Sequence, residues 1–223
     1  MTKKARAASC VEALKKEYPD AICALEFEGD PWKLLVMARL SAQCTDARVN
    51  LVCKTLFKEI PNAKAMAEAP IEKIESLIRS CGLYRMKAKD LKRMSEQLIT
   101  DFNGVVPDNM DDLLSLSGVG RKIANLILGD LYHKPAIVTD THCIRICGRL
   151  GFYSESLKDP YKIEKILVKD IEEKEQSDFC HRIVLFGREI CSARAPKCKS
   201  CPLNKLCKHY SEAKGEKQNG TLS

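Results

Sequence analysis

The segment at residues 116–122 has the composition of a phosphate-binding turn, and it directly precedes a largely apolar run at 123–131. It reads Leu-Ser-Gly-Val-Gly-Arg-Lys. Two glycines around one small apolar residue allow close approach of the backbone to a ligand, and the amides and positive dipole end of the following helix favour an anion. A plain turn between packed helices is an equal alternative. The predicted phosphate contacts are Gly118, Val119, Gly120 and Arg121, with Lys122 at the mouth of the site.

Four cysteines in the last quarter of the sequence have the spacing of a metal site. They are Cys191, Cys198, Cys201 and Cys207, in the pattern C-x6-C-x2-C-x5-C. Four thiolates bind either a tetrahedral zinc ion or an iron–sulfur cluster, and this spacing does not distinguish the two. Basic residues surround the cysteines, among them Arg194 and Lys197. We therefore expect a metal-bound loop that presents positive charge to a phosphate backbone.

A carboxylate follows the glycine turn in the segment Ala-Ile-Val-Thr-Asp-Thr-His at residues 136–142. Asp140 stands where the N-cap of a helix belongs, directly before a new apolar pattern. Taken alone, it is interpreted as a cap. His142 is a secondary candidate for contact with phosphate or with Asp140, and a structural histidine is about equally expected.

The composition is that of a globular protein with a basic surface. The chain has 223 residues, a formal net charge of +7 and 45% hydrophobic residues. This charge favours a polyanionic partner. No secretory signal is visible at the N-terminal end and no apolar run approaches the ~18 residues of a membrane span. We expect a soluble, cytoplasmic monomer, in which the eight singly placed cysteines are small buried thiols.

The apolar spacing predicts one helix after another, with hardly any period-2 stretch. Helices are expected at 5–17 and 87–102, and further helices begin at Asp30-Pro31, Asp46 and Pro70. After Val106-Pro107, a short helix at 110–116, the Gly-Val-Gly turn and a helix from Arg121 make a helix-hairpin-helix. Such a hairpin suits binding of phosphates without sequence specificity.

These motifs together, in this order and spacing, resemble the endonuclease III family of DNA base-excision glycosylases. The resemblance covers about residues 11–208 and includes Leu-Ser-Ala-Gln at 40–43, Thr-Asp at 45–46 and Gly-Leu-Tyr at 82–84. It implies an all-α, two-domain helix-hairpin-helix DNA glycosylase fold with a C-terminal iron–sulfur cluster loop. The implied domains are a helical barrel at 24–134 and a cluster domain at 1–23 and 135–210. A disordered tail is expected at 211–223.

The resemblance also implies the chemistry. Lys122 would attack C1′ of a damaged nucleotide, form a Schiff base and cleave the strand by β-elimination, while Asp140 assists. Gln43 and Leu83 would fill the space left by the extruded nucleotide. The four cysteines would hold a structural [4Fe-4S] cluster. The implied partner is double-stranded DNA with oxidised pyrimidines or abasic sites.

Four positions depart from the family's pattern and put the lesion spectrum in doubt. Ser117 replaces a proline, Ile123 a threonine, Thr139 an aliphatic residue and Ala195 a lysine. Two alternatives stay open beside the bifunctional glycosylase. One is a monofunctional mismatch glycosylase, which Lys122 argues against because those relatives lack a lysine there. The other is a non-catalytic iron–sulfur DNA-binding protein, which would make Lys122 and Asp140 coincidental.

Overall fold

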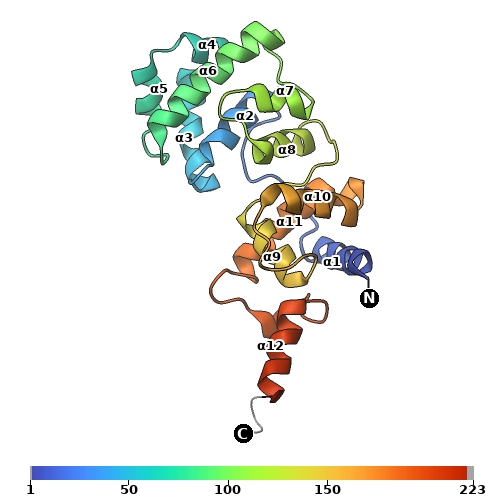
Figure 1. Cartoon of the computed structure of the whole chain (residues 1–223). Coiled ribbons are helices and arrows are strands. Elements are labelled where there is room, and N and C mark those ends of the chain that lie inside the picture. The colour runs from blue at the N-terminus through green and yellow to red at the C-terminus, as the bar shows by residue number, and fades with distance from the viewer. Residues whose placement is uncertain (1, 220–223) are drawn as a thin grey trace. The chain divides into compact units, whose positions relative to one another are not determined.

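The computed structural model describes residues 2–219, and the part of the chain it describes is entirely helical and free of strands (Figure 1). The chain forms two compact units. Unit 2 is continuous, Cys23–Lys134, and unit 1 combines Met1–Ile22 with Pro135–Ser223. Among the described residues, no helix is both long and apolar enough to cross a membrane. The all-α prediction is confirmed.

Unit 2 contains seven helices, which the local caps delimit. They are α2 (Pro31–Leu40), α3 (Asp46–Glu59), α4 (Ala63–Glu68), α5 (Ile71–Leu77), α6 (Tyr84–Phe102), α7 (Met110–Ser115) and α8 (Arg121–Asp130). Asp30 caps α2 by accepting hydrogen bonds from the amides of Trp32 and Lys33 at 2.9 and 3.1 Å. Thr45 and Asn109 cap α3 and α7 in the same way. These caps satisfy amides that would otherwise lack partners inside the helix.

The central element of unit 2 is α2, which is buried on nearly every side. Its only exposed or half-buried positions are Pro31 and Lys33. A helix that is apolar all round must lie inside a core, and α2 packs against α3, α6 and α8. Each buried leucine of this helix stabilises the fold by about 1.5–3 kcal/mol relative to an exposed one.

Two helices of unit 2 differ from the sequence-based expectation. The helix expected at 87–102 begins at Tyr84, because Leu83 takes a left-handed conformation (φ 60°) that reverses the chain directly before it. Residues 84–86 are not buried, so the apolar pattern starts one turn later than the helix itself. Helix α4 was not predicted, since Met66 is its only buried residue.

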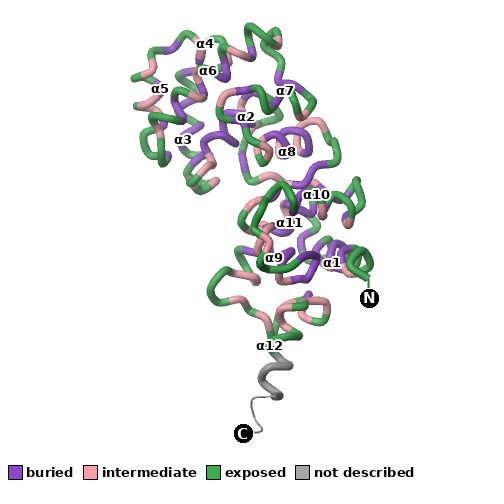
Figure 2. The backbone as a smooth tube through the Cα atoms, viewed as in Figure 1, coloured by how far each residue is buried: buried purple, intermediate pink, exposed green. Residues whose placement is uncertain are grey.

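Unit 1 contains α1 (Lys3–Glu17), α9 (Thr141–Leu150), α10 (Pro160–Asp170), α11 (Gln176–Glu189) and α12 (Lys208–Asn219), with short 3-10 helices at Glu173–Glu175 and Cys198–Ser200. The buried face of α1 packs against α10 and α11. Figure 2 shows buried positions recurring along α1, α9, α10 and α11. Phe152 and Phe179 stack in this core with ring centroids 6.5 Å apart.

Helix α12 is the last element of the described part of the chain. It spans Lys208–Asn219, and the disordered tail expected from residue 211 stays a prediction. Residues 208–219 lack proline and β-branched residues, and Lys208 pairs with Glu212 one turn later at 3.4 Å. Both features favour a helix. Residues 220–223 of the predicted tail lie outside the described residues.

Candidate functional site

The glycine turn between α7 and α8 adopts a conformation that only glycine fits. Gly118 has φ +76°, and a Cβ atom there would lie 2.6 Å from Nε of Arg39 and 2.9 Å from Cβ of Asp90. A side chain would therefore be strained in its backbone and would collide with buried neighbours. Val119 is buried, and its amide donates to the carbonyl of Leu116 at 3.1 Å. The turn is held in one shape.

Side chains of α2 and α6 anchor this turn. Arg39 donates from Nε and Nη2 to one carboxylate oxygen of Asp90 at 2.8 and 2.5 Å, and this pair is largely buried. Asp90 also accepts from the Ser117 hydroxyl at 3.3 Å. The Ser117 amide donates to Oε1 of Gln97 at 2.7 Å. A proline at position 117 could not make that last bond, so the serine gives this turn an anchor of its own.

Gly120 and Lys122 lie on the open side of the turn. A Cβ atom at Gly120 would meet nothing within 4 Å. Gly120 is the N-cap of α8 and provides no side-chain hydrogen bond, so the first amides of α8 have no partner from their own cap. Arg121 is half-buried and Lys122 is exposed. This end of α8 lacks a side-chain cap and carries two basic residues, a combination that favours a bound phosphate.

Two further turns of unit 2 carry exposed residues in left-handed conformations. Gln43 follows α2 and has φ 54°, and Leu83 precedes α6 and has φ 60°. Leu83 is 51% exposed, so its side chain is accessible to another molecule. The turns are neighbours, because a Cβ atom on Gly82 would lie 3.4 Å from the Gln43 carbonyl oxygen.

The same two helices therefore carry the anchors of the hairpin and the two exposed turns. Lys87, fully buried on α6, donates from Nζ to the carbonyl of Leu40 at the end of α2, at 2.7 Å. Burial lowers the pKa of this lysine. Since Asp90 lies seven residues after Leu83 on α6, the turn and the anchor are about 10 Å apart along that helix. Gln43, Leu83 and the hairpin share one rigid support.

In unit 1, Asp140 caps α9. Its Oδ1 accepts from the amide of Cys143 at 2.7 Å, and the residue is half-buried. The preceding Thr139 is buried. The ring nitrogen Nδ1 of His142 lies 3.2 Å from Nη2 of Arg145, and the ring packs closely over Gly187 of α11. His142 thus has structural contacts, whereas the Asp140 carboxylate is fixed by a single cap bond.

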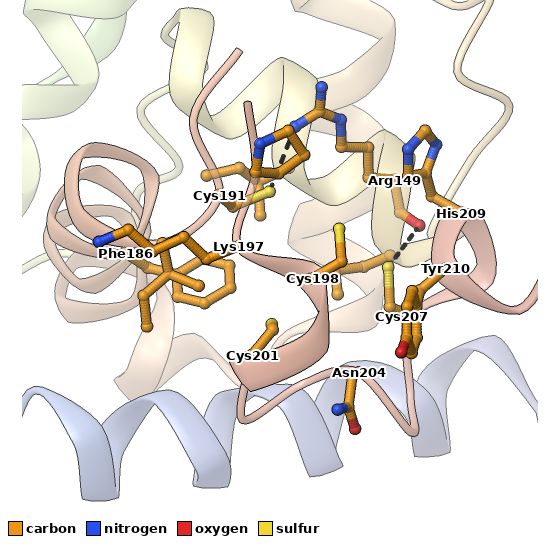
Figure 3. A pocket seen from close by; sticks show the side chains of 14 residues that line it. Arg149, Phe186, Cys191, Lys197, Cys198, Cys201, Asn204, Cys207, His209 and Tyr210 are labelled. Carbon is orange, nitrogen blue, oxygen red and sulfur yellow. Dashed lines mark hydrogen bonds between the residues drawn. The ribbon is translucent and has the colours of Figure 1, made fainter. Parts of the chain in front are cut away.

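The four C-terminal cysteines line one hollow, which Figure 3 shows from close by. Its wall includes Ile146 and Leu150 of α9, Phe186 of α11 and Tyr210 of α12. All twelve cysteines are free thiols, and the described residues include no group of three or more His, Cys, Asp or Glu side chains converging on one ion. Arg194 and Lys197 of the same loop are exposed.

Two arginines of α9 hold the cysteine loop. Arg149 donates to the carbonyls of Ser192 and Ala193 at 2.8 and 2.9 Å and to Sγ of Cys191 at 3.4 Å. The Cys207 thiol donates to the Arg149 carbonyl at 3.4 Å (Figure 3). Arg145 donates to the Cys191 carbonyl at 3.0 Å. The helix that Asp140 caps therefore also fixes this loop.

The chemistry of the hollow fits a positively charged inorganic group. Burial, and then the other cysteines, raise the pKa of Cys201 to about 11, and burial also raises the pKa of Cys207. Four thiolates in this setting would repel one another and lose hydration. A bound metal group reverses both effects, because it pairs with the thiolates directly.

Comparison with known proteins identifies the family of the chain. The profile of the HhH-GPD superfamily of base excision DNA repair proteins matches residues 36–173. Endonuclease III of Synechocystis is 42% identical over 207 residues, 92% of this chain and 93% of the relative. Endonuclease III of Bacillus subtilis is 39% identical over 201 residues, 89% of this chain and 90% of the relative. The chain belongs to the endonuclease III family.

Solved structures of the endonuclease III family superpose on nearly the whole chain. A trapped covalent endonuclease III–DNA intermediate matches with a TM-score of 0.90 and 41% identity, covering 96% of this chain and all of that one. A thermostable thymine-DNA glycosylase, 22% identical with a TM-score of 0.85, shares the fold. The resemblance inferred from the motifs is confirmed.

The predicted site residues of this endonuclease III relative fall into two groups. Unit 2 holds the hairpin with Lys122 and the two turns with Gln43 and Leu83, and unit 1 holds Asp140, His142, the basic loop and the cysteines. Sequence reasoning missed the supporting residues, which are Arg39, Lys87, Asp90, Gln97, Arg145 and Arg149. Charged residues among otherwise buried helix positions, such as Arg39 and Lys87, were the available signal.

Proposed function

We propose that the protein removes oxidised pyrimidines from duplex DNA and cleaves the strand at the resulting abasic site, with Lys122 as the nucleophile. The observation that carries this proposal is the exposed lysine next to a phosphate-binding turn that is locked in shape. Membership of the endonuclease III family supports it. A plain packing turn would need neither an open Gly120 nor uncapped amides at α8.

The proposed chemistry begins with extrusion of the damaged nucleotide, because C1′ of its sugar is inaccessible inside the base stack. Leu83 and Gln43 occupy the vacated space, and the exposed leucine then loses its contact with water. Gly118, Val119, Gly120 and Arg121 bind the backbone phosphate next to the lesion. Binding through main-chain amides is independent of sequence, as a repair enzyme requires.

Lys122, as the neutral amine, then attacks C1′ and the base leaves with the bond electrons. Asp140 stabilises the positive charge that develops on the sugar, or accepts the proton that the lysine loses. Loss of one proton from nitrogen and cleavage of the C1′–O4′ bond, with a proton delivered to O4′, give a protonated Schiff base with the opened sugar. Its adjacent C2′ proton is acidic, and removal of that proton expels the 3′ phosphate by β-elimination.

Cys191, Cys198, Cys201 and Cys207 would hold a [4Fe-4S] cluster. Four thiolates that line one hollow can bind the separate iron atoms of a cluster, and membership of the endonuclease III family favours the cluster over a single zinc ion. The bound cluster would serve as a structural cross-link rather than as a redox reagent. Arg194 and Lys197 on the fixed loop then contact the DNA backbone. His142 would add a further contact if its ring moved away from Gly187, over which it packs.

The decisive experiment is borohydride trapping on a duplex that contains thymine glycol or an abasic site. Wild-type protein forms a covalent adduct and Lys122→Ala forms none. Lys64→Ala, which removes another exposed lysine of unit 2, serves as the matched control and traps normally. Equal trapping by Lys122→Ala would refute the assignment of Lys122 as the nucleophile. Release of the base without any adduct in the wild type would indicate a monofunctional glycosylase.

A second variant separates the two roles of Asp140. Asparagine caps helices about as well as aspartate, so Asp140→Asn should leave the free energy of unfolding unchanged to within about 0.5 kcal/mol. Its single-turnover rate of base release should fall by roughly 100-fold or more, because the negative charge is gone. An unchanged rate of base release would show that Asp140 serves only as a helix cap.

A further inference from the structure

Lys87 lies inside unit 2, and its side chain is not exposed at all. Its Nζ atom donates to the Leu40 carbonyl at 2.7 Å, across 47 positions of the sequence. Lysine is among the residues that are least often fully buried, because burial removes water from its charged end. A specific contact must compensate for the lost hydration, and here that contact is to the main chain at the end of α2. No step of the proposed mechanism uses this lysine.

The place of Leu40 at the end of α2 explains why a lysine is suited to this contact. The last carbonyls of a helix have no partner within it. The Ser41 amide and hydroxyl bond the carbonyls of Met37 and Ala38 at 2.9 and 2.8 Å, and Lys87 bonds that of Leu40. The negative end of the helix dipole lies at the same place and favours a cation. Lys87 therefore caps this end of α2 from another helix.

The main chain of Lys87 is bonded to the turn that carries Leu83. Its amide donates to the Leu83 carbonyl at 3.1 Å, which is the first hydrogen bond of α6. Its side-chain partner, Leu40, precedes Gln43 by only three residues. The two turns also touch each other at Gly82 and the Gln43 carbonyl, so a shift of one is transmitted to the other. One residue thus holds the Gln43 turn by its side chain and the Leu83 turn by its backbone.

Other side-chain contacts between α2 and α6 lie farther along α6 from the two turns. Arg39 pairs with Asp90, and Nε1 of Trp32 donates to the Ser95 hydroxyl at 3.2 Å. The contacts follow the two helices in antiparallel order, and the Lys87 bond is at the end where the turns lie. Ser95 is eight residues beyond Lys87, about 12 Å along the helix. The Lys87 bond is therefore placed to set the spacing of the turns, whereas the Ser95 bond holds the far ends of the helices.

We propose that Lys87 is a positioning residue for nucleotide extrusion, which fixes the Gln43 and Leu83 turns at the spacing needed to fill the space left by the extruded nucleotide. Its buried side chain touches no substrate, so it acts through Gln43 and Leu83. This role rests on the function proposed above, because extrusion is one step of that reaction. The effect of Lys87 on the two turns can be measured without DNA.

Loss of the Lys87 contact should affect one step of the reaction selectively. Without it, the Leu40 carbonyl is left unpaired inside the protein and the turn that follows relaxes. Since a misplacement of about 1 Å can cost roughly 100-fold in rate, we expect extrusion of a damaged nucleotide to slow by at least about tenfold. A preformed abasic site has no base to unpair or unstack, so its cleavage should slow by less than about threefold. A lysine that only stabilised the fold would affect both substrates equally.

The first test compares Lys87→Met with Ser95→Ala in the absence of DNA. Methionine removes the donor but keeps most of the side-chain length, and an apolar group in place of a buried charge is often tolerated. Ser95→Ala is the matched control, because it removes a buried hydrogen bond between the same two helices. Hydrogen–deuterium exchange at residues 41–44 and 81–87 should speed up by roughly tenfold in Lys87→Met but not in Ser95→Ala. Unchanged exchange in Lys87→Met would show that the lysine does not hold the turns.

The second test measures extrusion directly in the cluster-loaded proteins. A duplex with 2-aminopurine beside thymine glycol reports extrusion as a rise in fluorescence, because unstacking of the neighbouring base exposes the probe. In Lys87→Met this rise and the release of the base should both slow by at least about tenfold, while cleavage of an abasic duplex slows by less than about threefold. Ser95→Ala should match the wild type in all three measurements.

The outcomes separate this role from the proposed function. Equal losses on the two duplexes, or a loss in Ser95→Ala as large as in Lys87→Met, would refute the role of Lys87 alone. A wild-type protein that is inert on both duplexes would refute the proposed function, and with it any role in extrusion.

Lys87→Gln is the second variant, for the case that Lys87→Met does not fold. Its amide nitrogen lies one bond closer to the main chain than the lysine Nζ atom, so it does not reach the Leu40 carbonyl without movement of the chain. The same difference between the two duplexes is expected. If neither variant folds, Lys87 is required for the fold as a whole, and a role specific to the two turns is overturned.

Discussion

Replacing Gly118 by alanine tests whether the glycine turn is locked as described. Alanine at φ +76° costs about 1–2 kcal/mol of backbone strain. Its methyl group would lie 2.6 Å from Arg39 Nε and 2.9 Å from Asp90 Cβ, and such crowding typically costs about 1–3 kcal/mol. The variant should therefore lose about 2–5 kcal/mol, a decrease of the melting temperature by roughly 5–15 °C.

Gly120→Ala is the matched control, because Gly120 differs from Gly118 both in its backbone conformation and in the space around it. Gly120 has φ −103°, which any residue adopts, and its added methyl group meets nothing within 4 Å. Because Gly120 is the N-cap of α8 and alanine caps helices less well than glycine, its free energy of unfolding should fall by about 1 kcal/mol, less than for Gly118→Ala. The methyl group does stand where a phosphate would approach, so affinity for duplex DNA should fall.

Calorimetry of both variants measures the change in stability, and a DNA-binding titration measures the change in affinity. We expect Gly118→Ala to be strongly destabilised, and Gly120→Ala to melt only slightly below the wild type but to bind DNA more weakly. Equal melting temperatures for the two variants would show that the contacts of Arg39 and Asp90 do not constrain the turn. Unchanged DNA affinity of Gly120→Ala would show that this turn does not contact DNA.

Three further predictions concern residues around the two sites. Gln97→Ala removes the hydrogen bonds to Ser117 and Ser115 and should cost about 1–2 kcal/mol in urea unfolding, with weaker DNA binding. The Lys15 ammonium, and then the Arg182 guanidinium, hold the pKa of Glu175 below its usual 4.5. The ionised carboxylate therefore contributes stability above pH 4.5, and this contribution is lost as the pH falls through the lowered pKa of the folded protein. Glu175→Gln should flatten the decline in unfolding free energy between about pH 6 and pH 3. Arg149→Ala removes three hydrogen bonds to the cysteine loop and should speed iron release to a chelator by roughly tenfold or more, whereas Lys199→Ala, at an exposed position of the same loop, should not.

The features that could be predicted from the sequence are those specified by neighbouring residues. The hairpin is one example, since two glycines, a short helix before them and an apolar run after them all lie within about twenty residues. Asp30 before Pro31 predicts the start of α2 for the same reason. The all-helical fold follows from apolar spacing, which is repeated in each helix.

The features that sequence reasoning missed depend on contacts between distant residues. Arg39 and Asp90 pair across 51 positions, and nothing near either residue indicates its partner. The start of α6 at Tyr84 was missed because Leu83 adopts a conformation that its residue type disfavours, which only its surroundings impose.

The division of unit 1 into two separate stretches of chain affects the order in which the protein is made. Unit 2 is continuous and can fold as soon as Lys134 has left the ribosome. Helix α1 buries Ala7, Cys10, Val11 and Leu14 against helices that include α11, which is synthesised about 170 residues later. At ~5–20 residues per second, its apolar face waits roughly 10–35 s for that partner. Throughout this interval the nascent chain carries a helix whose apolar face is uncovered, and the cysteine loop at residues 191–207 is synthesised only after α11.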